Sequence, residues 1–226
     1  MKQYLITAGM ALACLVAQAQ VTIGLHGGPL FGTVALDGDV PEEEFLEAEI
    51  RLATAFELSA PIVFGVSERF GIQSGVGLLR RPFRQVLDFD GAGFTETFEA
   101  KVLYTALEVP LLARVTFVPD GPVSLAGYLG PSFQYLTAAK VAFSTGSGGG
   151  TQTIKLDFDS EDAEAIRRGN VFAVGGLQLA VPFAETGLAA TADLRYRHQV
   201  DDTDDRDEAT ERSRLLAVLL GLTYRL

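Results

Sequence analysis

Two histidines and several groups of carboxylates are the residues of this chain whose types suit chemistry. His198 stands three residues before Asp201 and Asp202, which raises the question of a hydrolase or a metal site. A hydrolase needs a nucleophile within hydrogen-bond reach of its base. Because no serine or threonine stands near His198 on the same face of its predicted strand, we expect no enzyme. For His26 we expect a hydrogen-bonded structural role.

Two acidic segments are the second chemical feature. They contain Asp37, Asp39, Glu42, Glu43, Glu44, Glu47 and Glu49, and Asp201, Asp202, Asp204, Asp205, Asp207, Glu208 and Glu211. Carboxylate oxygens bind hard cations, so Asp201, Asp202, Asp204 and Asp205 are candidate metal ligands. Neither segment has the spacing of an EF-hand, and hydrated surface loops are the simpler interpretation.

The glycine-rich segment "GSGGGT" at 146–151 is a third place where a ligand might be sought. It lacks the Gly-Lys-Ser/Thr ending and the following helix start of a phosphate-binding loop. We therefore interpret it as a loop tip and predict no cofactor.

The elements that must position these residues are strands, because large apolar residues alternate with small or polar ones. One face of the last stretch consists of Leu216, Val218, Leu220, Leu222, Tyr224 and Leu226. The same period predicts eight strands, at 21–34, 51–59, 68–81, 102–117, 123–135, 171–183, 188–198 and 215–226. Many are close to the ~9 to 11 residues with which a tilted strand crosses a bilayer.

The connections between these strands alternate in length. Long loops are predicted after the first, third, fifth and seventh strands. The loop after the third strand is "RPFRQVLDFDGAGFTE". Short connections follow the second, fourth and sixth strands, and "VPDGP" carries the Pro and Asp-Gly signals of a tight turn. An up-and-down meander with both chain ends on one side places every long loop on the other side.

The less apolar face of the strands decides between two kinds of barrel. In a soluble lipocalin-like barrel the apolar face points inward, whereas in a membrane barrel it points out to lipid. Here the second face is rich in Gly, Ala, Ser and Thr, and aromatic residues fall near the strand ends of the apolar face. Both features favour the membrane barrel, and a soluble periplasmic ligand binder is the alternative.

Charged residues of both signs also fall on the second face. The predicted lumen network is Glu57, Glu108, Arg114, Asp193, Arg195 and Arg197, with Arg51 on the same face. Because buried charges must be paired, we expect them to pair across the lumen. Eight strands leave an interior that side chains just fill, so we predict a plugged barrel. A narrow pore or transport barrel is the alternative.

The first twenty residues, "MKQYLITAGMALACLVAQAQ", have the basic start, apolar core and Ala-x-Ala ending of a secretory signal. We predict a signal peptide at 1–19 and a barrel domain at 20–226. A lipoprotein signal cut before Cys14, the single cysteine, is the alternative. The net charge of −11 argues against nucleic-acid binding, which requires a basic face.

Three strands resemble those of one known family. "YTALEVPLLARVTF" (104–117) is similar to the "LEIPLLLKY" strand of the PorT-like outer-membrane β-barrel family of Bacteroidetes. "AGYLGPSFQYL" (126–136) resembles the Gly-Pro strand that follows, and "IGLHGGPLFG" (23–32) resembles the opening strand. The resemblance implies an eight-stranded outer-membrane barrel and no particular activity.

The chain ends with Gly221, Tyr224 and Leu226, which resemble the C-terminal signal read by the outer-membrane assembly machinery, although Leu226 stands where Phe is usual. We predict an all-β, eight-stranded antiparallel up-and-down transmembrane β-barrel, monomeric, in the outer membrane of a Gram-negative bacterium. Its expected role is structural or surface interaction. The expected partners are outer-membrane lipids and lipopolysaccharide, the assembly machinery and an unidentified surface protein.

Overall fold

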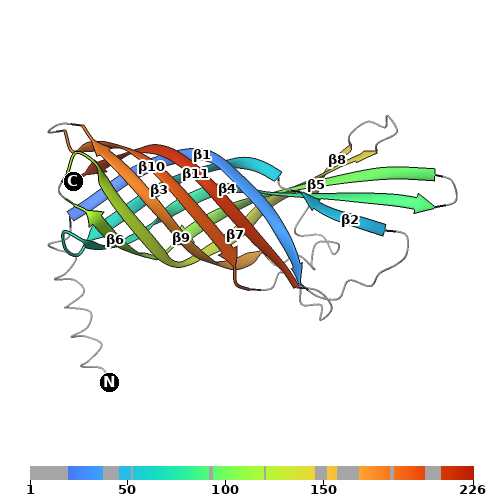
Figure 1. Cartoon of the computed structure of the whole chain (residues 1–226), viewed down its shortest axis with the longest axis horizontal. Coiled ribbons are helices and arrows are strands. Elements are labelled where there is room, and N and C mark those ends of the chain that lie inside the picture. Colours follow the sequence, from blue (N-terminus) through green and yellow to red (C-terminus); the bar gives the residue numbers. More distant parts are fainter. Residues whose placement is uncertain are drawn as a thin grey trace, which may run out of the picture.

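A single antiparallel sheet closes on itself to form a barrel (Figure 1). The computed structural model describes residues 20–37, 46–51, 53–91, 94–119, 121–145, 152–156, 168–183, 186–201 and 210–226. Their strands are β1 (Gln20–Asp37), β2 (Leu46–Arg51), β3 (Ala53–Gly65), β4 (Phe70–Gly91), β5 (Phe94–Pro110), β6 (Leu112–Val118), β7 (Ser124–Thr145), β8 (Gln152–Leu156), β9 (Gly169–Pro182), β10 (Leu188–Gln199) and β11 (Thr210–Arg225).

Eight strand positions form the barrel wall, in the order β1, β3, β4, β5 with β6, β7, β9, β10 and β11. β1 pairs with β11, which closes the wall and removes its free edges. β5 and β6 share one position, since both pair with β4 and with β7. They are separated at Leu111, next to Pro110, which has no N–H to donate to a neighbouring strand. The predicted eight-stranded antiparallel meander is confirmed.

The two ends of the barrel differ. The connections from β3 to β4, from β6 to β7 and from β9 to β10 lie at one end, at the left of Figure 1. The chain terminates at the same end, where the N–H of Leu226 donates to the carbonyl of Val21 at 2.9 Å. In an outer-membrane barrel short turns mark the periplasmic end, so the opposite end of a barrel of that class would be extracellular.

The prediction of a long loop after the third strand is wrong. β4 and β5 remain paired from Gly77 and Glu108 to Gly91 and Phe94. β2 adds to this extension through β4, and β8 adds through β7, so strands project beyond the wall (Figure 1). The predicted strand ended at 81, but the Val and Phe residues of "RPFRQVLDFDGAGFTE" favour strands, and the hairpin satisfies their backbone groups.

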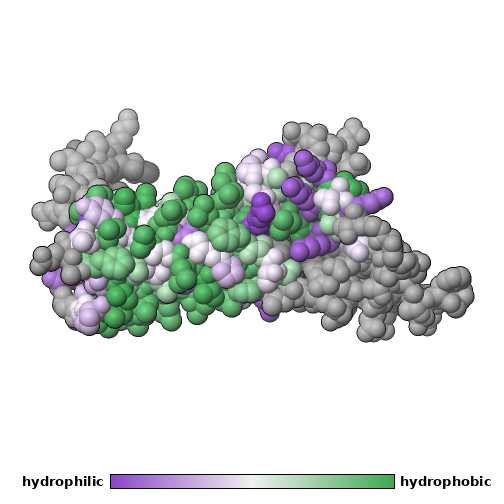
Figure 2. Space-filling model, turned by 90° about the horizontal axis from the view of Figure 1, so that it is seen from above, coloured by the Kyte–Doolittle hydropathy of each residue, from purple (hydrophilic) through white to green (hydrophobic). Residues whose placement is uncertain are grey.

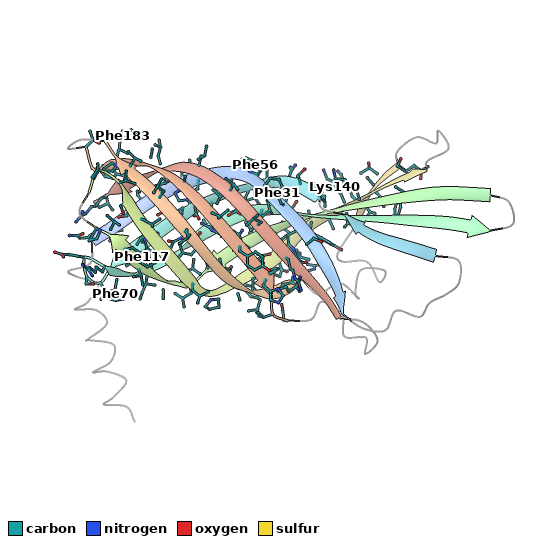
Figure 3. All side chains as sticks on the ribbon, in the orientation of Figure 1. Phe31, Phe56, Phe70, Phe117, Lys140 and Phe183 are labelled. Atoms are coloured by element: carbon teal, nitrogen blue, oxygen red, sulfur yellow. The ribbon has the colours of Figure 1, made fainter. Side chains whose placement is uncertain are left out.

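The outer surface of the wall is an apolar belt (Figure 2). Val76, Leu129 and Leu220 are each more than 60% exposed. In a barrel with its apolar face inside, few large apolar side chains would be this exposed. Phe70, Phe117 and Phe183 point outward at the short-turn end, where an interfacial aromatic girdle is expected (Figure 3). This outward apolar face excludes the lipocalin-like alternative.

Among the described residues, helices of the length and hydrophobicity that a membrane span requires are not found.

Candidate functional site

The charged residues meet in the lumen because strand alternation turns them all inward. On β10, Asp193, Arg195 and Arg197 occupy every second position and are buried. Glu57 reaches them from β3, and Glu108 reaches them from β5. Five of the six residues of the predicted lumen network therefore lie together, although they come from three strands.

Arg195 and Arg197 hold these carboxylates by direct ion pairs. Arg195 Nη1 lies 3.0 Å from Glu57 Oε1, and its Nη2 lies 2.8 Å from Asp193 Oδ2. Arg197 Nη2 lies 2.7 Å from both Glu57 Oε1 and Glu108 Oε2. Each guanidinium thus bridges two carboxylates, which offsets the cost of burying the charges.

Glu108 receives further hydrogen bonds from β7. Ser132 Oγ donates to Glu108 Oε1 at 2.9 Å, and Gln134 Nε2 donates to the same oxygen at 3.2 Å. Arg197 Nε also donates to this atom, at 2.8 Å. Glu108 is therefore held from β7 and from β10, and this carboxylate is the most fully bonded group of the network.

Tyr128, on β7, extends the network toward β1. Its hydroxyl donates to Asp193 and accepts from Arg195 Nε at 3.1 Å, and its ring lies 5.7 Å from the Arg195 guanidinium. His26 Nδ1 lies 3.7 Å from Asp193 Oδ2, and His26 Nε2 lies 3.0 Å from the Thr191 hydroxyl. His26 therefore has the hydrogen-bonded position expected of it, inside the lumen.

The Tyr128 ring depends on a glycine in the next strand. A Cβ at Gly176, on β9, would lie 2.3 Å from the Tyr128 hydroxyl and 2.6 Å from the Leu194 carbonyl oxygen. Both distances are shorter than any real Cβ contact. Gly176 therefore creates the space in which Tyr128 reaches Asp193.

Arg114, on β6, bonds to amides. It donates to Gln73 Oε1 at 2.9 Å and to Gln178 Oε1 at 2.6 Å. Gln178 pairs with Asp193 between β9 and β10, so Arg114 adjoins the ion pairs through this amide. The six predicted residues comprise three carboxylates and three guanidiniums, so their formal charges sum to zero.

A second polar group lies at the extracellular side. Arg81 Nη2, on β4, donates to Gln199 Oε1 at 3.1 Å and to Ser213 Oγ at 2.7 Å. The Arg81 guanidinium lies 5.1 Å from the centre of the Phe172 ring. The alternation of the predicted strand at 68–81 places Arg81 on the inward face with Gln73, but Arg81 was not among the residues of the predicted lumen network.

The sequence predicted a lumen filled by small and paired charged residues, and the structure shows a packed apolar cluster beside the ion pairs. The buried cluster contains Leu30, Leu79, Ala106, Leu112, Tyr128, Leu136, Phe172, Val174, Leu215, Ala217 and Leu219. Leu79 pairs with Glu57 between β3 and β4, and Leu215 pairs with Arg197 between β10 and β11. A cavity lined by Ser59, Gln73 and Glu108 has a volume of about 10 Å³, close to the space of one water molecule.

The candidate metal ligands lie elsewhere. Asp201 Oδ1 accepts a hydrogen bond from the backbone N–H of Val171 at 2.8 Å, while Asp202, Asp204 and Asp205 are outside the described residues. Within the described ranges, no group of three or more His, Cys, Asp or Glu could hold a metal ion. The side chain of Arg51 is also outside the described part.

His198 and the C-terminal residues complete the predicted sites. His198 stands between the inward Arg197 and Gln199, so it is on the outward face, away from the ion pairs. Tyr224 and Leu226 are exposed on that same face. Gly221 pairs with His26, and a Cβ there would lie 2.3 Å from the His26 ring and 2.2 Å from the Leu25 carbonyl oxygen. Gly221 thus has a packing role whether or not it is part of an assembly signal.

Comparison with known proteins gives the family. Residues 16–205 match the family model described as the outer membrane protein beta-barrel domain, and the chain belongs to this family. It is therefore an outer-membrane β-barrel protein. No curated protein matches the chain.

Solved outer-membrane barrels are among the structures to which the chain is similar. OprG from Pseudomonas aeruginosa is 11% identical, with a TM-score of 0.48, over 92% of this chain and 97% of OprG. Ail from Yersinia pestis is 16% identical, with a TM-score of 0.39, over 91% of this chain and 98% of Ail. Neisserial surface protein A is 9% identical, with a TM-score of 0.40, over 90% and 97% of the two chains.

Proposed function

We propose that this protein is a plugged, non-enzymatic barrel that acts structurally in the outer membrane and presents its extracellular strands for surface contacts. The observation that carries this proposal is the filled lumen. Glu57, Glu108 and Arg197 are at most 1% exposed and pair with one another inside the lumen, through which a solute would have to pass. An ion crossing the barrel would have to separate charges that now neutralise one another.

The proposal favours a plug over the narrow pore. A conducting eight-stranded barrel would need a continuous hydrated path, and the apolar cluster interrupts the polar surface of the lumen. The lumen beside the charged side chains is also narrow, because the cavity next to Glu108 has room for about one water molecule. Opening the lumen would require the bridging arginines to move together.

Planar-bilayer recording of the refolded protein tests this proposal. We expect no discrete openings from the wild type. The variant R195A/R197A, which removes both bridging side chains and leaves three carboxylates, should give cation-selective openings. R225A, at the exposed periplasmic rim, serves as the control and should be as silent as the wild type. Discrete openings of the wild-type protein would contradict the plug and favour the pore.

The surface role rests on the strands that project beyond the wall. β2, β8 and the outer parts of β4 and β5 form a sheet extension at the end where the acidic segments begin and end. This arrangement supports contacts with an unidentified surface protein, for which pull-down from intact cells is the test. Calcium binding by the acidic segments is a separate hypothesis. Calorimetric titration of the folded protein with Ca²⁺ tests it, and the absence of saturable heat would contradict it.

Several finer predictions belong to this proposal. They are the signal peptide at 1–19, membership of the PorT-like branch, a monomeric state and recognition of Gly221, Tyr224 and Leu226 by the assembly machinery. The strands at 23–32, 104–117 and 126–136 support the PorT-like resemblance. N-terminal sequencing of the mature protein tests the first prediction, since a start at Gln20 is expected.

A further inference from the structure

The three lysines of the described residues lie on neighbouring strands. The sequence has four lysines and a net charge of −11. Apart from Lys2, they are Lys101 on β5, Lys140 on β7 and Lys155 on β8, and all three are exposed. These three residues, called the lysine patch below, belong to three neighbouring strands of the extracellular extension. Such a cluster is unexpected in an acidic protein.

The strand register places the three lysines on one face. Lys140 is paired directly with Lys155 between β7 and β8. Lys101 is paired with Ala142, two residues beyond Lys140 on the same face of β7. Directly paired residues have Cβ atoms about 4.5–5.5 Å apart, and diagonal neighbours stay within reach of long side chains. The three ammonium groups can therefore contact one ligand.

A β-bulge turns Lys140 to this face. Thr105 pairs with Ala138, but Ala106 pairs with Leu136, so Thr137 is an extra residue in β7. Tyr135 points outward, and strict alternation would have placed Lys140 in the lumen. The bulge reverses the alternation, so Lys140 joins Lys155 on the outer face of the sheet. Figure 3 shows Lys140 where the extension leaves the barrel wall.

Like charges that are directly opposite each other destabilise a pair of strands. Lys140 and Lys155 are in this position, and no described acidic side chain forms an ion pair with either of them. Charge repulsion of this kind is relieved when an anion binds between the two ammonium groups. The pairing therefore points to an anionic ligand.

The lysine patch lies at the upper boundary of the apolar belt. Ten residues separate Phe70, in the periplasmic girdle, from the outward and exposed Arg80 on β4. This distance is about 33 Å along the strand, or about 25 Å along the membrane normal at a usual tilt, which is the height of the lipid-facing band. Arg80 pairs with Thr105 of β5. Lys140 pairs with Leu103, which is the next outward residue of β5 in the extracellular direction. Figure 2 shows hydrophilic side chains gathered at this end of the belt.

We propose that the lysine patch, with Arg80 at its lower edge, binds the phosphate groups of the phosphorylated glycolipid in the outer leaflet. Lysine ammonium groups bind phosphate as point charges, and the patch stands at the height of lipid headgroups. Leu107, on the outer face of β5 and below the level of Arg80, is 49% exposed and is placed to contact acyl chains. This proposal rests on the position of the barrel in the outer membrane and is independent of whether the lumen conducts.

Binding of fluorescent, bis-phosphorylated lipid A to the refolded full chain in zwitterionic micelles is the test. K140Q/K155Q should weaken binding roughly 30-fold, whereas K140R/K155R, which keeps both charges, should bind within about twofold of the wild type. R69Q/R225Q removes two exposed charges at the periplasmic end and should bind like the wild type. Dephosphorylated lipid A should bind the wild type as weakly as the phosphorylated lipid binds K140Q/K155Q.

Thermal unfolding and competition by inorganic phosphate complete the test. K140Q should not lower the midpoint of thermal unfolding without lipid, because it relieves the repulsion with Lys155. Inorganic phosphate at millimolar concentration should not displace the lipid. Equal lipid binding by the wild type and K140Q/K155Q would overturn the proposal, and complete displacement by inorganic phosphate would overturn the lipid as the ligand.

Discussion

Arg197 and Glu108 form a two-point ion pair across the lumen, with Arg197 Nε 2.8 Å from Glu108 Oε1 and Nη2 2.7 Å from Oε2. The two residues are 89 positions apart in the sequence, and they meet because β10 and β5 face each other in the closed barrel. Two parallel N–H···O bonds fix the orientation of both groups. The same Nη2 also donates to Glu57, so one guanidinium connects three strands.

Replacing Arg197 with methionine should be strongly destabilising. R197M leaves Glu108 buried without its cation, and breaking a buried pair in this way costs about 3–5 kcal/mol of the free energy of unfolding. The double variant E108Q/R197M should lose less than the sum of the two single variants, because neither charge is then left unpaired. Urea unfolding of the refolded barrel, followed by heat-modifiable gel migration, measures these losses. Strictly additive losses would mean that the pair is not coupled.

Replacing Gly176 with alanine should disturb Tyr128. The added Cβ would meet both the Tyr128 hydroxyl and the Leu194 carbonyl oxygen, and overpacking of this kind costs about 1–3 kcal/mol. Gly65, also in a strand, has its nearest atom 3.4 Å from the added Cβ, so G65A is the matched control. Equal unfolding midpoints for G176A and G65A would show that the close contact at Gly176 can relax without cost.

Replacing Leu220 with lysine should test the lipid-facing surface. Leu220 is 66% exposed within the apolar belt, and a lysine at the bilayer midplane of such a barrel costs about 2–4 kcal/mol. L226K, at the periplasmic end, should cost about 0–1 kcal/mol, because charges near the interface remain hydrated. Unfolding of both variants from lipid vesicles gives the comparison. Equal and small losses of the free energy of unfolding for L220K and L226K would contradict a lipid-facing belt at Leu220.

Deleting residues 221–226 should abolish assembly. This segment pairs with Thr22–His26 of β1 and with Leu188–Thr191 of β10, so its removal leaves open the seam at which the barrel closes. Fractionation of outer membranes should show no folded, heat-modifiable protein for the truncated chain. L226F, which restores the usual terminal aromatic residue, is the companion variant and should assemble at least as well as the wild type. Normal insertion of the truncated chain would contradict the closing role of β11.

Much of the wall follows from the sequence. Leu216, Val218 and Leu220 face lipid, and Asp193, Arg195 and Arg197 face the lumen, as the period of two predicts. This success has a local cause, since side-chain direction in a strand depends only on the neighbouring residues. The strand count and the direction of each face are therefore available from the sequence, and so is the class of membrane barrel.

The contacts inside and above the barrel required the tertiary structure. Arg197 with Glu108, and Tyr128 with Asp193, are partners because eight strands close with one particular register, which no local pattern contains. The extension of β4 and β5 was predicted to be a loop, and only the pairing between these two strands shows that it is a hairpin. Lys140 is the clearest case: by alternation alone it would face the lumen, and the single extra residue at Thr137 turns it outward beside Lys155. The period of two thus determined the faces of the strands, while register and bulge decided which side chains meet, because both are set by pairing between strands distant in the chain.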